Sequence, residues 1–151
     1  MTISAIKGKV QEDMKDAMRS QQKDRLAAIR LILAALKQRE IDERIVLTDE
    51  QVIAVLDKMQ KQRRESISQY EAAHRQDLVQ KERDEMQVIQ GYLPAQLSPA
   101  EVETLIEAAI KETGASSARD MGKVMGILKP KLQGRADIAV VSNKVKERLS
   151  A

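Results

Sequence analysis

Apolar residues recur at three- and four-residue steps along most of the chain, a spacing that aligns side chains on one face of an α-helix. The first such series consists of Ile3, Ile6, Val10, Met14, Ala17 and Met18. It predicts a helix that follows Thr2 and ends near Ser20. A second series follows the polar break at 21–23 and consists of Leu26, Ile29, Leu33 and Leu36. Asp24 is the expected N-cap of this second helix.

The third helix is marked most clearly by its start. Thr48-Asp-Glu-Gln51 has the form of a capping box, in which the Thr hydroxyl accepts from the Gln51 backbone and the Gln side chain reaches back. Apolar positions then continue to Ala73, and a further helix after Asp77 would complete an antiparallel hairpin. Arg63 and Arg64 lie in the middle of the long helix, where Gln60 and Glu65 flank them. Local pairing is the preferred interpretation of these arginines, and an extended basic surface is the alternative.

The helical pattern breaks at Gly91-Tyr-Leu-Pro94, because the residue before a proline disfavours helical geometry. We therefore expect an N-terminal helical-hairpin domain over 1–93 and a C-terminal domain over 94–151. Ser98-Pro-Ala-Glu101 combines a second capping box with a proline at the first helical position. The helix that starts there is expected to end at Gly114, a natural left-handed terminal residue.

Two short helices complete the predicted C-terminal domain. One follows Asp120 as its cap and should kink or stop near Lys129, because Pro130 lacks a backbone N–H. The other follows Asp137 and carries apolar residues at Val140, Val141, Val145 and Leu149. The whole pattern predicts an all-α protein, with N-terminal hairpins of about four helices and a small C-terminal three-helix domain.

Composition excludes several kinds of site. Among the 151 residues there is no Cys and one His, so a disulfide, a thiolate metal site and a multi-histidine site are all excluded. No apolar run approaches the roughly 18 residues that a membrane span needs, and the expectation is a cytoplasmic protein without membrane contact. None of the familiar nucleotide-binding, metalloprotease or serine-hydrolase motifs is present. The sequence therefore predicts no catalytic residue, no metal and no cofactor.

Positive charge is concentrated near the C-terminus. Residues 114–151 hold 8 Lys and Arg against 3 Asp and Glu, net +5, whereas residues 1–113 have 18 against 20, net −2. A basic segment suits an anionic partner, although lysine-rich helical surfaces are often merely solvated. The residues expected to contact RNA phosphates are Lys123, Lys129, Lys131, Arg135 and Lys144. Because Tyr70 and Tyr92 are the only aromatic residues, a platform for stacking single-stranded bases is not expected.

Gly122 and Gly126 lie four residues apart, which places them on one face of the predicted helix. Each glycine in a helix interior destabilises it by about 1 kcal/mol relative to alanine. Such positions indicate a close backbone approach, either by a neighbouring helix or by a phosphate backbone. Gly134 follows the same helix and is assigned the same alternatives.

Several segments resemble the YqeY family. They are Met121-Gly-Lys-Val-Met-Gly126, Pro130-Lys-Leu132, Gly134-Arg-Ala-Asp137 and Val145-Lys-Glu-Arg-Leu149, and also Glu12-Asp-Met-Lys15, Arg25 to Leu36, Gln62-Arg-Arg-Glu65, Tyr92-Leu-Pro94 and Gln96-Leu-Ser98. The sequence departs from the family at Ile138, where glycine is frequent, and at Ala139, where lysine is common. The C-terminal domain of the family is similar to the tail domain of the B and E subunits of glutamine-dependent tRNA amidotransferases, which engages the tRNA.

The resemblance and the charge pattern together favour an accessory module that binds structured RNA, with tRNA as the expected ligand. By resemblance, it would be associated with the glutamine-dependent amidation of mischarged tRNA, a carbon–nitrogen ligase reaction, without its own active site. A translation-related protein is a further expected partner. The alternative is a helical protein-interaction module that acts through the long hairpin. A third interpretation is an amidotransferase-like enzyme.

Overall fold

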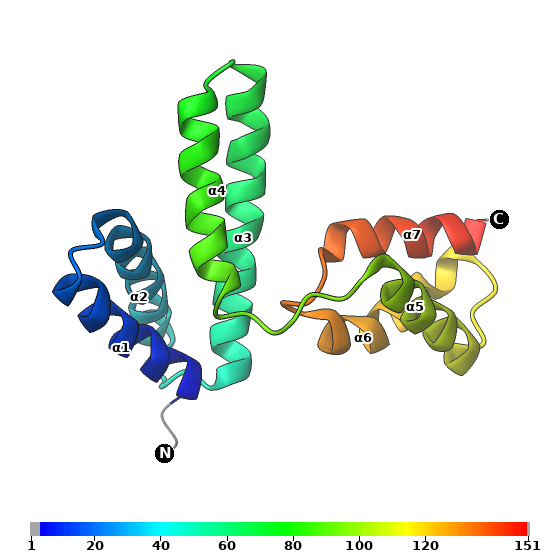
Figure 1. Ribbon diagram of the computed structural model, residues 1–151. Helices are drawn as coiled ribbons and strands as arrows, with labels where there is room; N and C mark the ends of the chain where they lie inside the picture. The colour runs from blue at the N-terminus through cyan, green and yellow to red at the C-terminus, as the bar shows by residue number, and fades with distance from the viewer. Residues whose placement is uncertain (1–3, 151) are drawn as a thin grey trace. The chain divides into compact units, whose positions relative to one another are not determined.

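The computed structural model describes residues 4–150, and within that range the chain forms α-helices and no strand. The helices are α1 (Ala5–Arg19), α2 (Lys23–Glu43), α3 (Asp49–Ala72), α4 (Gln76–Gln90), α5 (Pro99–Thr113), α6 (Met121–Leu132) and α7 (Ile138–Ser150), with a 3₁₀ turn at Ala118–Asp120. This arrangement confirms the predicted all-α class, with four helices followed by three (Figure 1). Backbone contacts divide the chain between Leu93 and Pro94. The two parts are called the N-terminal and C-terminal units.

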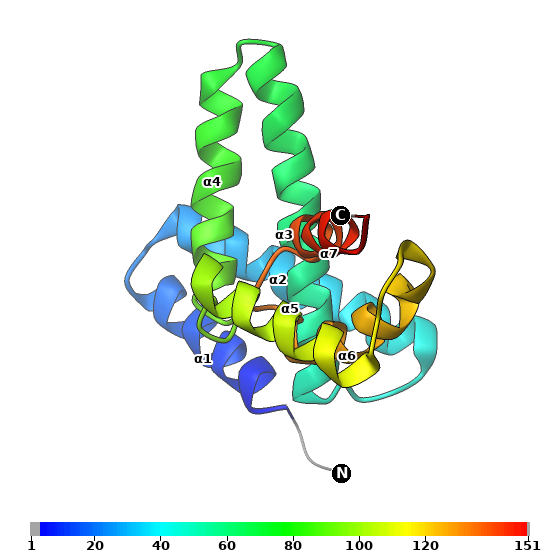
Figure 2. The same ribbon diagram turned by 90° about the vertical axis from the view of Figure 1, so that its right-hand side faces the viewer.

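The N-terminal unit has two helical pairs. α1 packs against α2, and α3 and α4 run side by side as a long hairpin that extends beyond the α1–α2 pair (Figures 1 and 2). The buried core joins both pairs and contains Val10, Ala17, Ile29, Ile32, Leu36, Leu47, Val52, Val55, Leu56, Met59, Ile89 and Tyr92. This core stops at Met59 on α3 and at Ile89 on α4. The outer half of the hairpin therefore lies outside it.

The α3–α4 hairpin is held by polar contacts as well as apolar ones. Arg63 Nε lies 3.1 Å from Glu85 Oε2, and the two side chains are only 12% and 16% exposed. The side-chain amide of the buried Gln60 donates to Met86 O at 3.0 Å. The preferred sequence interpretation of Arg63, local pairing on its own helix, is therefore wrong, because its partner lies on the antiparallel helix.

Tyr92 ties the end of the N-terminal unit to its first two helices. Its hydroxyl donates to Asp13 Oδ2 at 2.7 Å, and Asp13 also lies 3.8 Å from the Arg25 guanidinium. Burial of the ring raises the pKa of the Tyr92 hydroxyl, and the hydrogen bond to Asp13 raises this pKa further. The chain is thus anchored on α1 immediately before it passes into the C-terminal unit.

Glu40 connects α2 to α1 and to the loop before α3, and it gives the fold a pH dependence. One carboxylate oxygen lies 2.6 Å from Lys7 Nζ, and the other accepts from the Leu47 N–H at 3.1 Å. The hydrogen bond from Lys7 lowers the pKa of Glu40; partial burial opposes the shift, and the Leu47 hydrogen bond adds to it. Stability from the ionised Glu40 is therefore present above its unfolded pKa and is lost as pH falls through the folded pKa.

Glu40→Gln is accordingly expected to lower the free energy of unfolding by about 1 kcal/mol at neutral pH. Urea unfolding measured between about pH 7 and about pH 3 should show the difference from the wild type shrinking as the wild-type carboxylate becomes protonated. Glu12→Gln is the control, because Glu12 is 70% exposed and should show no comparable pH-dependent difference. If the loss of unfolding free energy in Glu40→Gln stayed constant from about pH 7 to about pH 3, the assigned role of Glu40 would be contradicted.

The C-terminal unit packs α5, α6 and α7 around its own core of Val102, Ile106, Ala109, Val124, Met125, Leu128, Leu132, Val141, Val145 and Leu149. Hydrogen bonds join the segment before α5 to the turn after α6. The Leu97 N–H donates to Arg135 O at 2.9 Å, and the Gln96 side chain donates to Gly134 O at 2.6 Å. These bonds fix where α6 ends relative to where α5 begins.

Two predicted helix starts and one predicted helix end are confirmed. Both capping boxes form, at Thr48 with Gln51 and at Ser98 with Glu101. Gly114 ends α5 in the left-handed conformation with φ of 66°. A capping box involves residues three apart, so it depends little on the rest of the fold.

Several other predicted helix ends are wrong. α2 and α4 begin at Lys23 and Gln76, so Asp24 and Asp77 lie in their first turns rather than at their N-caps. An acidic side chain in the first turn is also favoured by the helix dipole, which is why sequence alone confuses the two positions. α1 begins at Ala5 after the N-cap Ser4, and Thr2 lies outside the described residues.

α6 begins after Asp120 as predicted, but the role of Asp120 and the end of the helix differ from the prediction. Asp120 occupies the N-cap position, yet its carboxylate accepts from the Ser116 N–H at 3.0 Å instead of capping the helix. Pro130 lies inside α6, which continues to Leu132. The helix passes the proline because only its last turn is affected, and the Gln133 N–H donates to Lys129 O at 3.0 Å to close that turn.

Candidate nucleic-acid interface

α6 presents one face that no other part of the described C-terminal unit covers. Gly122, Gly126 and Lys129 follow each other at steps of four and three residues, so they lie along one side of the helix. All three are exposed. A Cβ atom added at Gly122 or Gly126 would have no atom outside its immediate helical surroundings within 4 Å. We call this side, made of these three residues, the glycine face.

Another side of α6, about 110° around the helix axis from the glycine face, holds the helix in place. Val124, Met125, Leu128 and Leu132 are buried there in the core of the C-terminal unit. The glycine face therefore lies outside the core contacts. The two glycines therefore serve no helix packing within the described C-terminal unit, although that was one alternative from the sequence.

The lysines of α6 differ in position. Lys129 belongs to the glycine face, and Lys123 lies beside it with its ammonium 4.0 Å from Asp120. Lys131 is two residues further on, about 200° around the helix axis from Lys129. Both Lys129 and Lys131 are exposed, and neither has an ion pair within residues 4–150. The sequence placed these lysines in one group, whereas the helix separates Lys129 from Lys131.

Asp120 keeps its negative charge beside the start of the glycine face. The hydrogen bond from the Ser116 backbone lowers the pKa of Asp120, with partial desolvation opposing it and Lys123 contributing a smaller charge effect. Since the Lys123 side chain is 73% exposed, it can turn from Asp120 to an incoming anion at small cost.

Arg135 and Lys144 have partners within the unit. Arg135 is half-buried, and its Nε donates to Ala95 O at 3.3 Å. Lys144 on α7 lies 3.6 Å from Glu103 on α5, whose carboxylate also lies 2.5 Å from Arg148. These contacts direct both predicted RNA-binding residues toward structural partners, whereas Lys129 and Lys131 on α6 have none of this kind within residues 4–150.

Gly134 has a local explanation. Its φ of 76° is in the left-handed region, which glycine adopts without steric strain, and its carbonyl accepts the Gln96 side chain. The glycine is therefore required by the turn that links α6 to α7.

Sequence reasoning left out one basic residue near this face. Arg119 lies in the 3₁₀ turn directly before α6, is exposed, and has no ion pair in the described part of the chain. An exposed cation next to a helix N-terminus is a signal that could have found it.

The described residues contain no cluster of three His, Cys, Asp or Glu side chains arranged to hold a metal ion. Over the same part of the chain, no helix combines the length and the apolar character that crossing a membrane requires. The glycine face therefore offers an exposed helical backbone, with the ammonium groups of Lys123 and Lys129 near it.

Comparison with known proteins gives a family and several relatives. A family model described as Yqey-like protein matches residues 7–149. Altered inheritance of mitochondria protein 41, mitochondrial, from Pyrenophora tritici-repentis is 34% identical over 95% of this chain and 80% of its own length. The protein of the same name from Vanderwaltozyma polyspora is 33% identical over 68% of this chain and 57% of its length. An uncharacterized protein of Schizosaccharomyces pombe is 30% identical over 64% of this chain and 78% of its own length.

Proposed function

The chain belongs to the Yqey-like protein family, and on that premise we propose that it is an accessory module that binds structured RNA, with tRNA as the first candidate. The names of the relatives state neither a ligand nor a reaction, so the proposal rests on α6. The observation that carries it is the glycine face, an open helical surface with a lysine that has no internal partner.

A surface of this kind suits the backbone of a nucleic acid. Two glycines without side chains let a phosphate–sugar backbone come close to the helix, and Lys129 and Lys123 supply positive charge beside it. Within residues 4–150, a Cβ at Gly122 or Gly126 would meet no atom beyond the surrounding helix backbone, which supports this use because an ordinary exposed helix would be more stable with alanine at such a site.

Structured RNA fits this surface better than single strands. Tyr70 and Tyr92, the two aromatic residues of the chain, both lie in the N-terminal unit. α6 therefore offers no ring on which an unpaired base could stack. Recognition through backbone and shape is typical of helical RNA.

The role in the cell follows from the resemblance to the amidotransferase tail domain. We propose that the chain holds a tRNA for a glutamine-dependent carbon–nitrogen ligase in the cytoplasm, and that the reaction itself is carried out elsewhere. A translation-related protein would then be its companion.

The test compares two lysines of the same helix. Lys129→Glu is expected to weaken binding of bulk tRNA to the full chain by about tenfold, because it reverses the charge on the glycine face. Lys131→Glu is the matched control, with the same change in net charge about 200° away, and should weaken binding by no more than about threefold. Fluorescence anisotropy measures both, and circular dichroism checks folding. Equal losses would show a response to net charge alone, and no loss from Lys129→Glu would refute the use of this face.

A further inference from the structure

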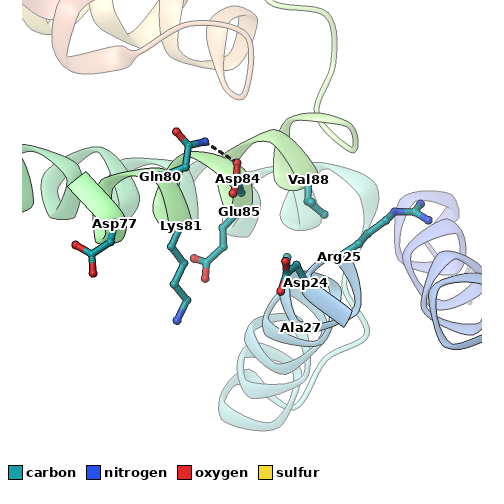
Figure 3. Close-up of a pocket in the computed structure, with 10 residues that line it drawn as sticks. Asp24, Arg25, Ala27, Asp77, Gln80, Lys81, Asp84, Glu85 and Val88 are labelled. Carbon is teal, nitrogen blue, oxygen red and sulfur yellow. Dashed lines mark hydrogen bonds between the residues drawn. The ribbon is translucent and has the colours of Figure 1, made fainter. Parts of the chain in front are cut away.

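The N-terminal unit has a second exposed surface, unrelated to the glycine face. A groove of about 410 Å³ runs between α2 and α4. Ala27 and Ala28 from α2 and Val88 from α4 form its apolar part, and Figure 3 shows the Val88 side chain directed toward α2. A second groove, of about 550 Å³, lies between α2 and α3 and includes Ala35 and Gln38. α2 is common to both grooves.

α2 is apolar on its exposed side as well as on its buried side. Ten of the eleven residues at 26–36 are apolar, Arg30 being the exception. Four of these apolar residues are buried in the unit, namely Ala28, Ile29, Ile32 and Leu36. Ala27, Leu31 and Ala34 are nonetheless exposed, and so is Ile41 further along. Leu31 is 44% and Ile41 59% exposed. A helix that is apolar all round is normally covered on all sides.

The exposed apolar residues lie along one side of α2, interrupted once by the exposed Gln38. Ala27, Leu31, Ala34 and Ile41 recur at helical steps of four, three and seven residues, and we call them the α2 strip. Ala27 also lines the α2–α4 groove. The strip is about 21 Å long at the rise of an α-helix, which is about the length of a four-turn helix.

The groove beside the strip is negatively charged. Four carboxylates line it against two cations, namely Asp24, Asp77, Asp84 and Glu85 against Arg25 and Lys81. Two of the carboxylates are neutralised by arginines outside the lining, because Asp77 lies 2.9 Å from Arg75 and Glu85 lies 3.1 Å from Arg63. The negative charge left to the groove is therefore that of Asp24 and Asp84. Arg25 is directed away from the groove in Figure 3 and lies 3.8 Å from Asp13 on α1. Asp24 has no ion pair within residues 4–150. The charge of the groove is thus opposite to what an RNA would need.

We propose that the α2 strip and the adjoining α2–α4 groove dock an amphipathic helix of a partner protein that carries Lys or Arg along one edge of its apolar face. The apolar strip, its length and the acidic groove each match one feature of such a helix, which would bind in the helix-in-groove mode. A second copy of this chain fits less well, because two-fold pairing through the same patch would bring the acidic grooves near each other. This surface would allow a protein and an RNA to be held on oppositely charged parts of one chain.

The test uses a synthetic peptide and the full chain. The peptide is a helix of about 18 residues with Leu at the spacing of one face and Lys along its edge, and the control peptide has Glu in place of every Lys. The Lys peptide is expected to bind, with backbone amide shifts that cluster at 24–42 and 77–88. The Glu peptide is expected to bind at least about tenfold more weakly.

Two pairs of variants test the surface. Leu31→Asp should weaken binding of the Lys peptide by about tenfold, whereas Met18→Asp, at an exposed residue of α1, should leave it unchanged. Asp24→Lys should weaken binding more than Glu65→Lys, which makes the same charge change outside the groove lining. Thermal unfolding checks that each variant folds.

Three results would overturn the proposal. They are unchanged binding by Leu31→Asp, equal binding of the two peptides, and wild-type dimerisation that Leu31→Asp abolishes, which would assign the strip to a second copy. Because this test measures peptide binding, its outcome does not depend on whether the proposed RNA function is correct.

Discussion

A chain in which Gly122 and Gly126 are both alanine is expected to be more stable than the wild type and to bind tRNA more weakly. Alanine is favoured over glycine by about 1 kcal/mol at a helix interior such as Gly126, and by less at Gly122, the second residue of α6, so the gain in unfolding free energy should be about 1.5 kcal/mol. Within residues 4–150 nothing obstructs the new methyl groups, because a Cβ at either site has open space around it. The same methyl groups would hold an RNA backbone away from α6, and we expect about a tenfold loss of affinity for bulk tRNA.

Gly8→Ala is the matched control for this pair. Gly8 lies within α1, and a Cβ there also has nothing within 4 Å. The substitution should therefore stabilise the chain by a similar amount per residue and leave tRNA binding unchanged. Urea unfolding and fluorescence anisotropy on the same preparations measure both quantities. A Gly122→Ala, Gly126→Ala chain that gains stability and keeps its full affinity would show that the glycine face makes no close contact with RNA.

Glu85→Leu is expected to lower the free energy of unfolding of the N-terminal unit by about 3 kcal/mol. The substitution removes the carboxylate that lies 3.1 Å from Arg63, whose side chain is only 12% exposed. The guanidinium would keep its bond to Met59 O and a weaker attraction to Glu82, and it would lose its hydrogen-bonded carboxylate. An uncompensated charge in a largely buried position is much more unfavourable than a missing surface ion pair.

The exposed pair on the same hairpin provides the comparison. Arg83 and Glu71 are 3.0 Å apart with side chains 54% and 47% exposed, so Glu71→Leu should change stability by less than about 1 kcal/mol. The double variant Arg63→Leu, Glu85→Leu should recover most of the loss, since neither charge is then left alone. Losses that simply add in the double variant, measured by urea unfolding, would contradict the assignment of Arg63 and Glu85 as a coupled pair.

The parts of the fold that follow from short-range rules could be predicted from the sequence. The helical spacing of apolar residues identifies seven helices, and the capping boxes at Thr48 and Ser98 place two helix starts. Of the helix starts marked only by a single Asp, those at Asp120 and Asp137 are correct, whereas those at Asp24 and Asp77 were misplaced by two residues. A lone carboxylate stabilises the first turn as well as the N-cap, so its position alone does not fix the boundary.

Contacts between helices could not be predicted in the same way. The partner of Arg63 is 22 residues away on the antiparallel helix, and finding it requires the register of the hairpin. The ion pair of Lys144 with Glu103 likewise joins α7 to α5. Such pairs depend on how helices pack, which a helical repeat in one segment does not determine.

The candidate site could be predicted from the sequence only in part. Glycine spacing and local charge select Gly122, Gly126 and Lys129 from the sequence alone, because the three lie at helical steps. Whether another helix covers them depends on packing, and the structure leaves them open. The separation of Lys131 from Lys129 required knowing that α6 continues past Pro130 to Leu132.

The measurement that tests the RNA proposal most directly is a salt titration of bulk tRNA binding to the full chain, in the wild type and in Lys129→Glu. The wild-type affinity should fall linearly with salt on logarithmic axes, with a slope that corresponds to about three phosphate contacts. Lys129→Glu should reduce that slope by about one. An affinity that does not change with salt, or no binding at about 50 mM salt where electrostatic association is strong, would contradict the proposal that α6 binds RNA.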